Sequence, residues 1–108
     1  MNAKLNLIFA RRSIRRYAHR PVSDDMIQDL LEAGMAAPSA CACDPWHFIV
    51  LKKPELLKKT AEALPNGKML DQAGVGFIVC GDLKKAHSGE ISYLLQDCSA
   101  AVENILIA

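Results

Sequence analysis

Hydrophobic residues recur along the chain with two different periods. Spacings of three and four residues, which place side chains on one face of a helix, occur in four stretches. Two shorter stretches, 47–51 and 75–80, are almost continuously apolar, as expected of buried strands. The pattern therefore predicts four helices and two strands, and we expect the second strand to be covered on both faces.

Capping residues and prolines indicate where the predicted helices begin and end. The first helix is predicted from about residue 3 to residue 11. The second follows Ser23, a good N-cap residue, and must end before Pro38, because the residue preceding a proline is forced out of the helical region. The third begins at Pro54, which suits the first helical position. The fourth has an expected apolar face made of Ile91, Leu94, Leu95, Cys98, Ala101, Val102 and Ile105.

The fourth helix ends in the middle of its apolar pattern. Residues 106–108 contain no glycine, asparagine or basic residue that could close it, so its last carbonyls lack partners. Two strands also make a thin sheet, since most sheets have about four to six. We therefore expect residues 1–108 to belong to one domain that is incomplete at its C-terminal end.

Composition narrows the class of protein. Hydrophobic residues make up 51% of the chain, which excludes a disordered protein, and no apolar run approaches the roughly 18 residues that span a bilayer. The net charge is only +1, but residues 1–20 hold six basic residues and no acid. The rest of the chain is acidic, so we expect no nucleic-acid partner, and the basic segment favours a local anion.

The cysteines favour a reducing compartment. No secretory signal precedes the four cysteines, so free thiols and a cytoplasmic location are expected, although an arginine-rich, acid-poor N-terminus also occurs in mitochondrial transit peptides. Cys41, Cys43 and His47 lack the spacing and the second ligand pair of a metal centre, so no metal is predicted.

Two segments could bind a ligand. Arg11, Arg12, Ser13 and Arg15 can surround a phosphate, because guanidinium groups and a hydroxyl all donate hydrogen bonds; the alternative is a solvated basic turn. The loop 37–46 combines small residues, two prolines and the only tryptophan, which allows close approach to a flat ligand; the alternative is a plain connector.

No grouping of side chains suggests a catalytic triad or another protein-based catalyst, so any chemistry would belong to a bound cofactor. A dinucleotide-binding fingerprint is also missing, because Gly74 and Gly76 precede a strand when they should follow one.

Taken in order, these segments resemble the nitroreductase family of FMN-dependent oxidoreductases. The resemblance covers essentially the whole chain. It is carried by the segments Arg11–Tyr17, Pro21–Ser23, Leu30–Gly34, Ala36–Ala40, Pro45–Phe48, Pro54–Leu56 and Asp97–Ala101.

The resemblance implies an α+β sandwich, a sheet wrapped by helices, assembled as an intertwined homodimer with the flavin at the subunit interface. It assigns FMN phosphate and ribityl contacts to Arg11, Arg12, Ser13 and Arg15. A second set of contacts, from the partner subunit, is assigned to Pro38, Ser39, Ala40 and Ala42.

The implied reaction is hydride transfer from NADH or NADPH to the flavin, then to a nitro, quinone or enone acceptor. No side chain in this stretch is expected to be catalytic. The family usually has asparagine where this chain has Ala42, and glutamine where it has Asp44. These departures leave open a non-catalytic flavin- or nucleotide-binding module of the same fold.

Overall fold

Two antiparallel strands form the centre of the computed structural model, which describes residues 1–108. They are β1 (Trp46–Leu51) and β2 (Gly76–Gly81), each within one residue of the range predicted from the sequence. Phe48 lies opposite Val79 and Ile49 opposite Ile78. These pairs project from opposite faces of the sheet, because side chains alternate along a strand.

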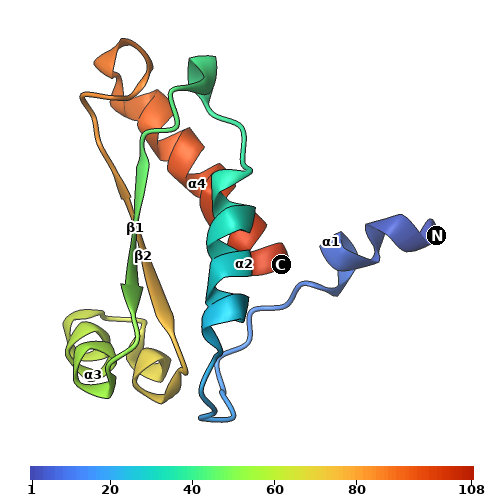
Figure 1. The fold of residues 1–108 in the computed structure, drawn as a ribbon, viewed down its shortest axis with the longest axis vertical. Coiled ribbons are helices and arrows are strands. Elements are labelled where there is room, and N and C mark those ends of the chain that lie inside the picture. The colour runs from blue at the N-terminus through green and yellow to red at the C-terminus, as the bar shows by residue number, and fades with distance from the viewer.

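The chain also forms four α-helices: α1 (Asn6–Ala10), α2 (Asp24–Met35), α3 (Pro54–Ala63) and α4 (Ile91–Ile107). Helices α2 and α4 pack together, and α4 lies against both strands (Figure 1). The predicted start signals are confirmed, because Ser23 Oγ accepts a hydrogen bond from the Met26 amide and Pro54 begins α3. A short 3₁₀ turn, Ala3–Leu5, precedes α1.

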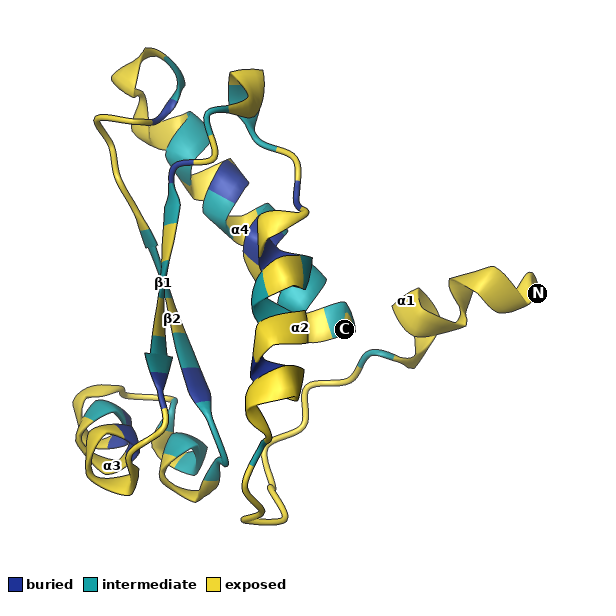
Figure 2. Ribbon diagram, viewed as in Figure 1, coloured by how far each residue is buried: buried dark blue, intermediate teal, exposed yellow.

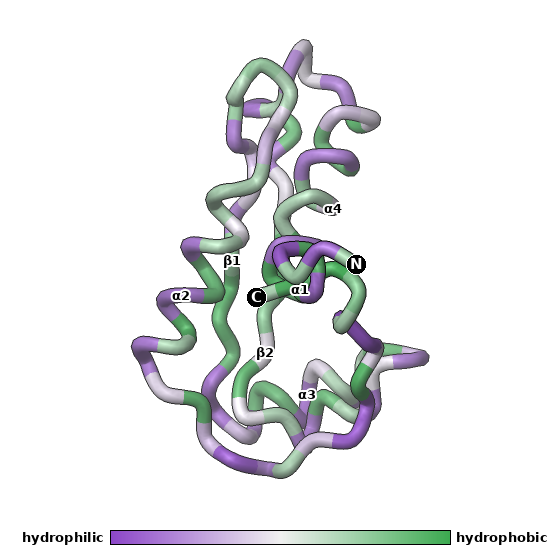
Figure 3. Tube along the Cα trace, turned by 90° about the vertical axis from the view of Figure 1, so that its right-hand side faces the viewer, coloured by the Kyte–Doolittle hydropathy of each residue, from purple (hydrophilic) through white to green (hydrophobic).

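The core lies where α2, α4 and β1 meet, with a second part beneath α3. Gly34 of α2 allows a close approach there, because a Cβ at this position would lie 3.0 Å from both Phe48 Cζ and Ile105 Cδ1 and would force them to shift. Hydrophobic colouring runs along β1 in Figure 3, whereas α2 alternates between apolar and polar positions. The buried residues are Ile27, Gly34, Ala37, Pro45, Leu51, Leu57, Ala61, Gly76, Ala86, Asp97 and Ala101.

The expected cover on both faces of the second strand is not present. Ile78 is 37% exposed and its cross-strand neighbour Ile49 is 42% exposed, because α2 and α4 lie on the other face of the sheet (Figure 2).

The predicted apolar face of α4 is only partly buried. Ala101 is buried, but Ile91, Leu95 and Val102 are exposed, because the predicted apolar stripe is wider than the surface that α4 buries.

The N-terminal residues form an arm that projects from the rest of the fold (Figure 1). All of residues 1–10 are exposed, including Leu7, Ile8 and Phe9. The link that follows the arm, residues 11–23, contains no helix or strand and leads back to the start of α2. No helix in the structure is long and apolar enough to cross a membrane.

Candidate functional site

The arginine–serine segment lies in the extended link directly after α1. Arg12 Nη1 donates hydrogen bonds to the carbonyls of Phe9 and Arg11, at 2.9 Å each, and so closes the end of α1. Arg11 Nε lies 3.9 Å from Glu103 Oε1 of α4. Both of those side chains are solvent-accessible, so their ion pair contributes little to stability.

Ser13 and Arg15 make no hydrogen bond or ion pair within the chain. Together with Arg11, they leave a hydroxyl and two guanidinium groups available to an anion. Arg12 is the exception, because its donors are turned back on the chain. The segment therefore has the donor set that a phosphate group needs, although not all four predicted residues present it equally.

The proline–serine loop forms a closed turn after α2. Ser39 Oγ donates a hydrogen bond to Asp44 Oδ1 at 2.6 Å and accepts one from the Asp44 amide at 2.9 Å. The Ala42 amide also donates to the Ser39 carbonyl, at 3.0 Å. The hydroxyl proton of Ser39 is thus used inside the turn, and the carboxylate of Asp44 faces Ser39.

The backbone of this turn is left-handed at three residues that have a Cβ. The φ angles are 53° at Cys41, 52° at Ala42 and 46° at Asp44. For residues other than glycine this conformation costs roughly 1–2 kcal/mol each. Strain of this kind persists only where surrounding contacts hold it, and it is found preferentially at functional sites.

One such contact comes from Asp97 of α4, which the sequence analysis did not assign to the site. Asp97 is only 4% exposed, and its Oδ1 accepts a hydrogen bond from the Ala40 amide at 2.9 Å. Its other carboxylate oxygen, Oδ2, is buried and has no partner in the chain. The available sequence signal was a single acid at helical spacing from Leu94 and Ala101.

The structure does not bring the two predicted halves of the site together within one chain (Figure 1). The turn meets α4 on its buried side, at Asp97, whereas the basic segment reaches the exposed Glu103 near the end of that helix. The two halves therefore contact different positions of α4 and do not contact each other.

A large open groove lies beside the basic link but contains none of the predicted cofactor-binding residues. Its volume is about 980 Å³, and it runs between the link, the start of β2 and the end of α4. Most of the lining is apolar, with Arg16 and Arg20 contributing charge. Gly74 is required in its wall, because a Cβ there would lie 2.2 Å from the Arg20 carbonyl oxygen.

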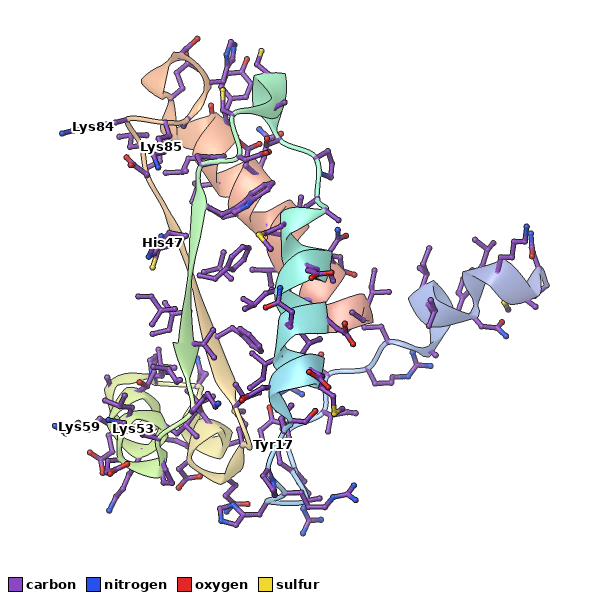
Figure 4. All side chains as sticks on the ribbon, viewed as in Figure 1. Tyr17, His47, Lys53, Lys59, Lys84 and Lys85 are labelled. Atoms are coloured by element: carbon purple, nitrogen blue, oxygen red, sulfur yellow. The ribbon has the colours of Figure 1, made fainter.

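His47 does not lie near Cys41 and Cys43, the two cysteines with which the sequence groups it. His47 projects from the side of the sheet opposite α2 and α4, away from the turn (Figure 4). His87 is the histidine near the turn, with Nε2 3.9 Å from Cys41 Sγ.

Burial, assisted by the charge of Asp97 and by Cys80, raises the pKa of Cys98 above its ordinary value, so this thiol stays neutral at pH 7.

Comparison with known proteins identifies relatives for the whole chain. A "putative NADH dehydrogenase/NAD(P)H nitroreductase" of Archaeoglobus fulgidus is 47% identical over 108 residues, which are 100% of this chain and 62% of the relative. A crystal structure with the same description, from Parabacteroides distasonis, matches with a TM-score of 0.89 and 39% identity, covering 99% of this chain and 61% of that one.

A third relative is the structure of a "putative nitroreductase in complex with FMN" from Desulfovibrio desulfuricans, with 32% identity and a TM-score of 0.85. It covers 99% of this chain and 62% of the other. The fold of this chain is therefore the α+β nitroreductase fold that the resemblance implied, and it spans about three-fifths of these relatives. The nitroreductase family model matches residues 8–67, more than half of the sequence. The chain belongs to the nitroreductase family.

Proposed function

We propose that the protein is an FMN-dependent oxidoreductase that takes hydride from NADH or NADPH and passes it to a nitro, quinone or enone acceptor. Family membership and the FMN-bound relative support this proposal. The observation that carries it is the donor set of this segment: Ser13 and Arg15 have no partner within the chain, and Arg11 has only a long, solvent-accessible ion pair with Glu103. The chain spans 62% of its relative from Archaeoglobus fulgidus, so the activity is proposed for the whole protein.

In this proposal, the phosphate of FMN binds to the arginine–serine segment. Arg11 and Arg15 supply charge-assisted donors, and Ser13 supplies a neutral one. The Pro38–Ala42 turn lies against the flavin ring, where its small side chains allow close approach of the backbone. When bound, FMN supplies the hydride-transfer chemistry, and the protein residues hold and orient it.

We also propose that the protein is a homodimer with the flavin at the subunit boundary. The separation of the two halves of the site supports this assembly, because one chain alone does not surround a ligand with both. The exposed apolar side chains of the arm, Leu7, Ile8 and Phe9, offer a surface that a second copy would cover. We further propose a cytoplasmic location, which the four free thiols favour.

A second candidate is a flavin- or nucleotide-binding module without catalytic activity. Ala42 favours it, because its methyl group cannot form the hydrogen bond that an asparagine would offer. Asp44, which replaces the family's usual glutamine, gives this candidate less support, because its carboxylate accepts a hydrogen bond from Ser39 Oγ. Reduction of the bound flavin by NADH or NADPH separates the two candidates, since only the enzyme is expected to accept hydride.

The proposal is tested by titrating the protein with FMN and then adding NADH or NADPH without oxygen. We expect saturable binding, followed by loss of the absorbance of oxidised flavin. Arg11→Ala and Ser13→Ala each remove a donor to the charged phosphate, and such a charge-assisted hydrogen bond is worth roughly 1.5–3 kcal/mol. Both variants should bind FMN more weakly and still fold.

Arg12→Ala provides a matched control. Because Arg12 already donates to two backbone carbonyls, its loss should weaken FMN binding less than the loss of Arg11. A protein that takes up no FMN contradicts the proposed function. Unchanged affinity in both Arg11→Ala and Ser13→Ala contradicts the assignment of the phosphate site.

A further inference from the structure

The Pro38–Ala42 turn is tied to α4 by one hydrogen bond, which a buried side chain accepts. Asp97 Oδ1 accepts from the Ala40 amide at 2.9 Å, across 57 residues of sequence. Most other bonds of the turn are local, since they join Ser39 to Ala42 and Asp44, or Ala40 to Cys43. The contact of the exposed Cys41 Sγ with His87 Nε2, at 3.9 Å, reaches the segment before α4 and not α4 itself. The local bonds fix the internal shape of the turn, but only the bond to Asp97 fixes its position relative to α4.

The turn has a conformation that needs such support. Cys41 and Ala42 in the turn, and Asp44 just after it, have positive φ angles without being glycine. Each therefore favours a return to ordinary backbone angles if the restraint is lost. The burial of Asp97 strengthens the restraint, because a hydrogen bond is electrostatically stronger in a medium of low dielectric constant than in water.

We propose that Asp97 is the positioning residue that holds the Pro38–Ala42 turn in the arrangement that binds the flavin. This inference rests on the proposed function, because it takes the turn to be part of the cofactor site. Asp97 acts through the backbone of Ala40 and does not itself touch the cofactor. Without its acceptor oxygen, the turn remains closed by the Ser39–Asp44 pair but loses its fixed position on α4.

The unpaired Oδ2 shows which property of Asp97 matters. Oδ2 is buried and has no hydrogen-bond partner in the chain, so only one of the two oxygens of this side chain holds the turn. The requirement is the acceptor at Oδ1. Asparagine has that acceptor and nearly the same shape, so it should replace Asp97 in this role, whereas alanine should not.

The experiment compares Asp97→Ala with Asp97→Asn. Hydrogen exchange of the Ala40 amide in the free protein measures whether the turn is held, and FMN titration measures whether the site is formed. In Asp97→Ala we expect exchange of the Ala40 amide to be faster by about tenfold or more, with a similar loss of FMN affinity. Asp97→Asn should stay close to the original protein in both measurements, which is the rescue that a positioning role requires.

Asn104→Ala is the matched control. Asn104 also lies on α4 and is partly buried, and its Nδ2 donates to the Ala33 carbonyl at 3.0 Å, which ties α4 to α2 and not to the turn. Its loss should lower overall stability without selectively exposing the Ala40 amide. If Asp97→Ala exposes all amides equally, as Asn104→Ala is expected to do, Asp97 is merely a core residue and the proposal is overturned.

Failure of this proposal can be distinguished from failure of the proposed function. If the unsubstituted protein binds FMN and Asp97→Ala binds it equally well, the positioning role is wrong and the function stands. If the unsubstituted protein binds no FMN, the function is wrong, and the cofactor role of Asp97 falls with it. The Ala40 exchange rate then still decides whether Asp97 holds the turn. If Asp97→Asn behaves like Asp97→Ala, the acceptor argument is overturned.

Discussion

Replacing Ala42 with asparagine would introduce an amide at a position whose backbone already suits it. Ala42 has a φ angle of 52°, in the left-handed region. Asparagine tolerates this region better than most residues with a side chain, and it is the residue that the family usually has at this position. We therefore expect Ala42→Asn to strengthen FMN binding without disturbing the turn.

The size of the effect follows from two separate contributions. A hydrogen bond from the new amide to the flavin would contribute about 0.5–1.5 kcal/mol, which corresponds to roughly a two- to twelvefold gain in affinity. Relief of the left-handed strain affects the turn before any ligand binds. It can be isolated with Ala42→Gly, because glycine has no steric penalty at positive φ but brings no amide.

The assay is a titration of FMN with the original protein and both variants, with a thermal melt of each variant to measure stability. Ala42→Gly should change stability by no more than about 1 kcal/mol, since the relieved strain is offset by the greater freedom of glycine in the unfolded chain. Ala42→Asn should bind FMN several-fold more tightly than Ala42→Gly. Equal affinities for the two variants would refute the argument that the side chain at this position reaches the flavin.

Two further predictions concern assembly and pH. We expect sedimentation to show that the chain is not a stable monomer, because Ile49, Ile78 and Leu106 expose apolar surface. Burying such surface against another chain stabilises it by roughly 25 cal/mol per Å². A monomer with one sharp thermal transition would contradict this prediction. The raised pKa of Cys98 means that the unfolded thiol ionises first, so stability present at neutral pH should fall as the pH rises above about 9. Urea unfolding between pH 7.5 and 10 measures this loss, and Cys98→Ala should reduce it.

The boundaries of the elements could be predicted because their causes are local. Ser23 caps α2 through an amide three residues away, and Pro54 begins α3 through its own fixed φ angle. The cover on β2 could not be predicted in the same way. An apolar strand indicates that burial is favourable, but which faces are covered depends on where α2 and α4 pack, and Ile78 remains exposed.

The two features that define the turn depend on contacts between distant parts of the chain. Nothing in the sequence around Cys41 and Ala42 requires positive φ angles, because neither residue is a glycine or an asparagine. The hydrogen bond that the buried Asp97 accepts comes from the Ala40 amide, which lies 57 residues earlier in the chain. Resemblance to a family indicated the segments that form the candidate site, whereas only the structure could reveal the contact between them and α4.

The separation of the basic segment from the turn has a consequence for mixed assemblies. If each flavin site takes the segment 11–15 from one chain and the turn 38–42 from the other, substitutions in the two regions impair different halves. A dimer formed from one chain of each kind would then have one site with both defects and one site with neither. Two inactive variants would in this way complement each other, whereas two variants altered in the same region would not.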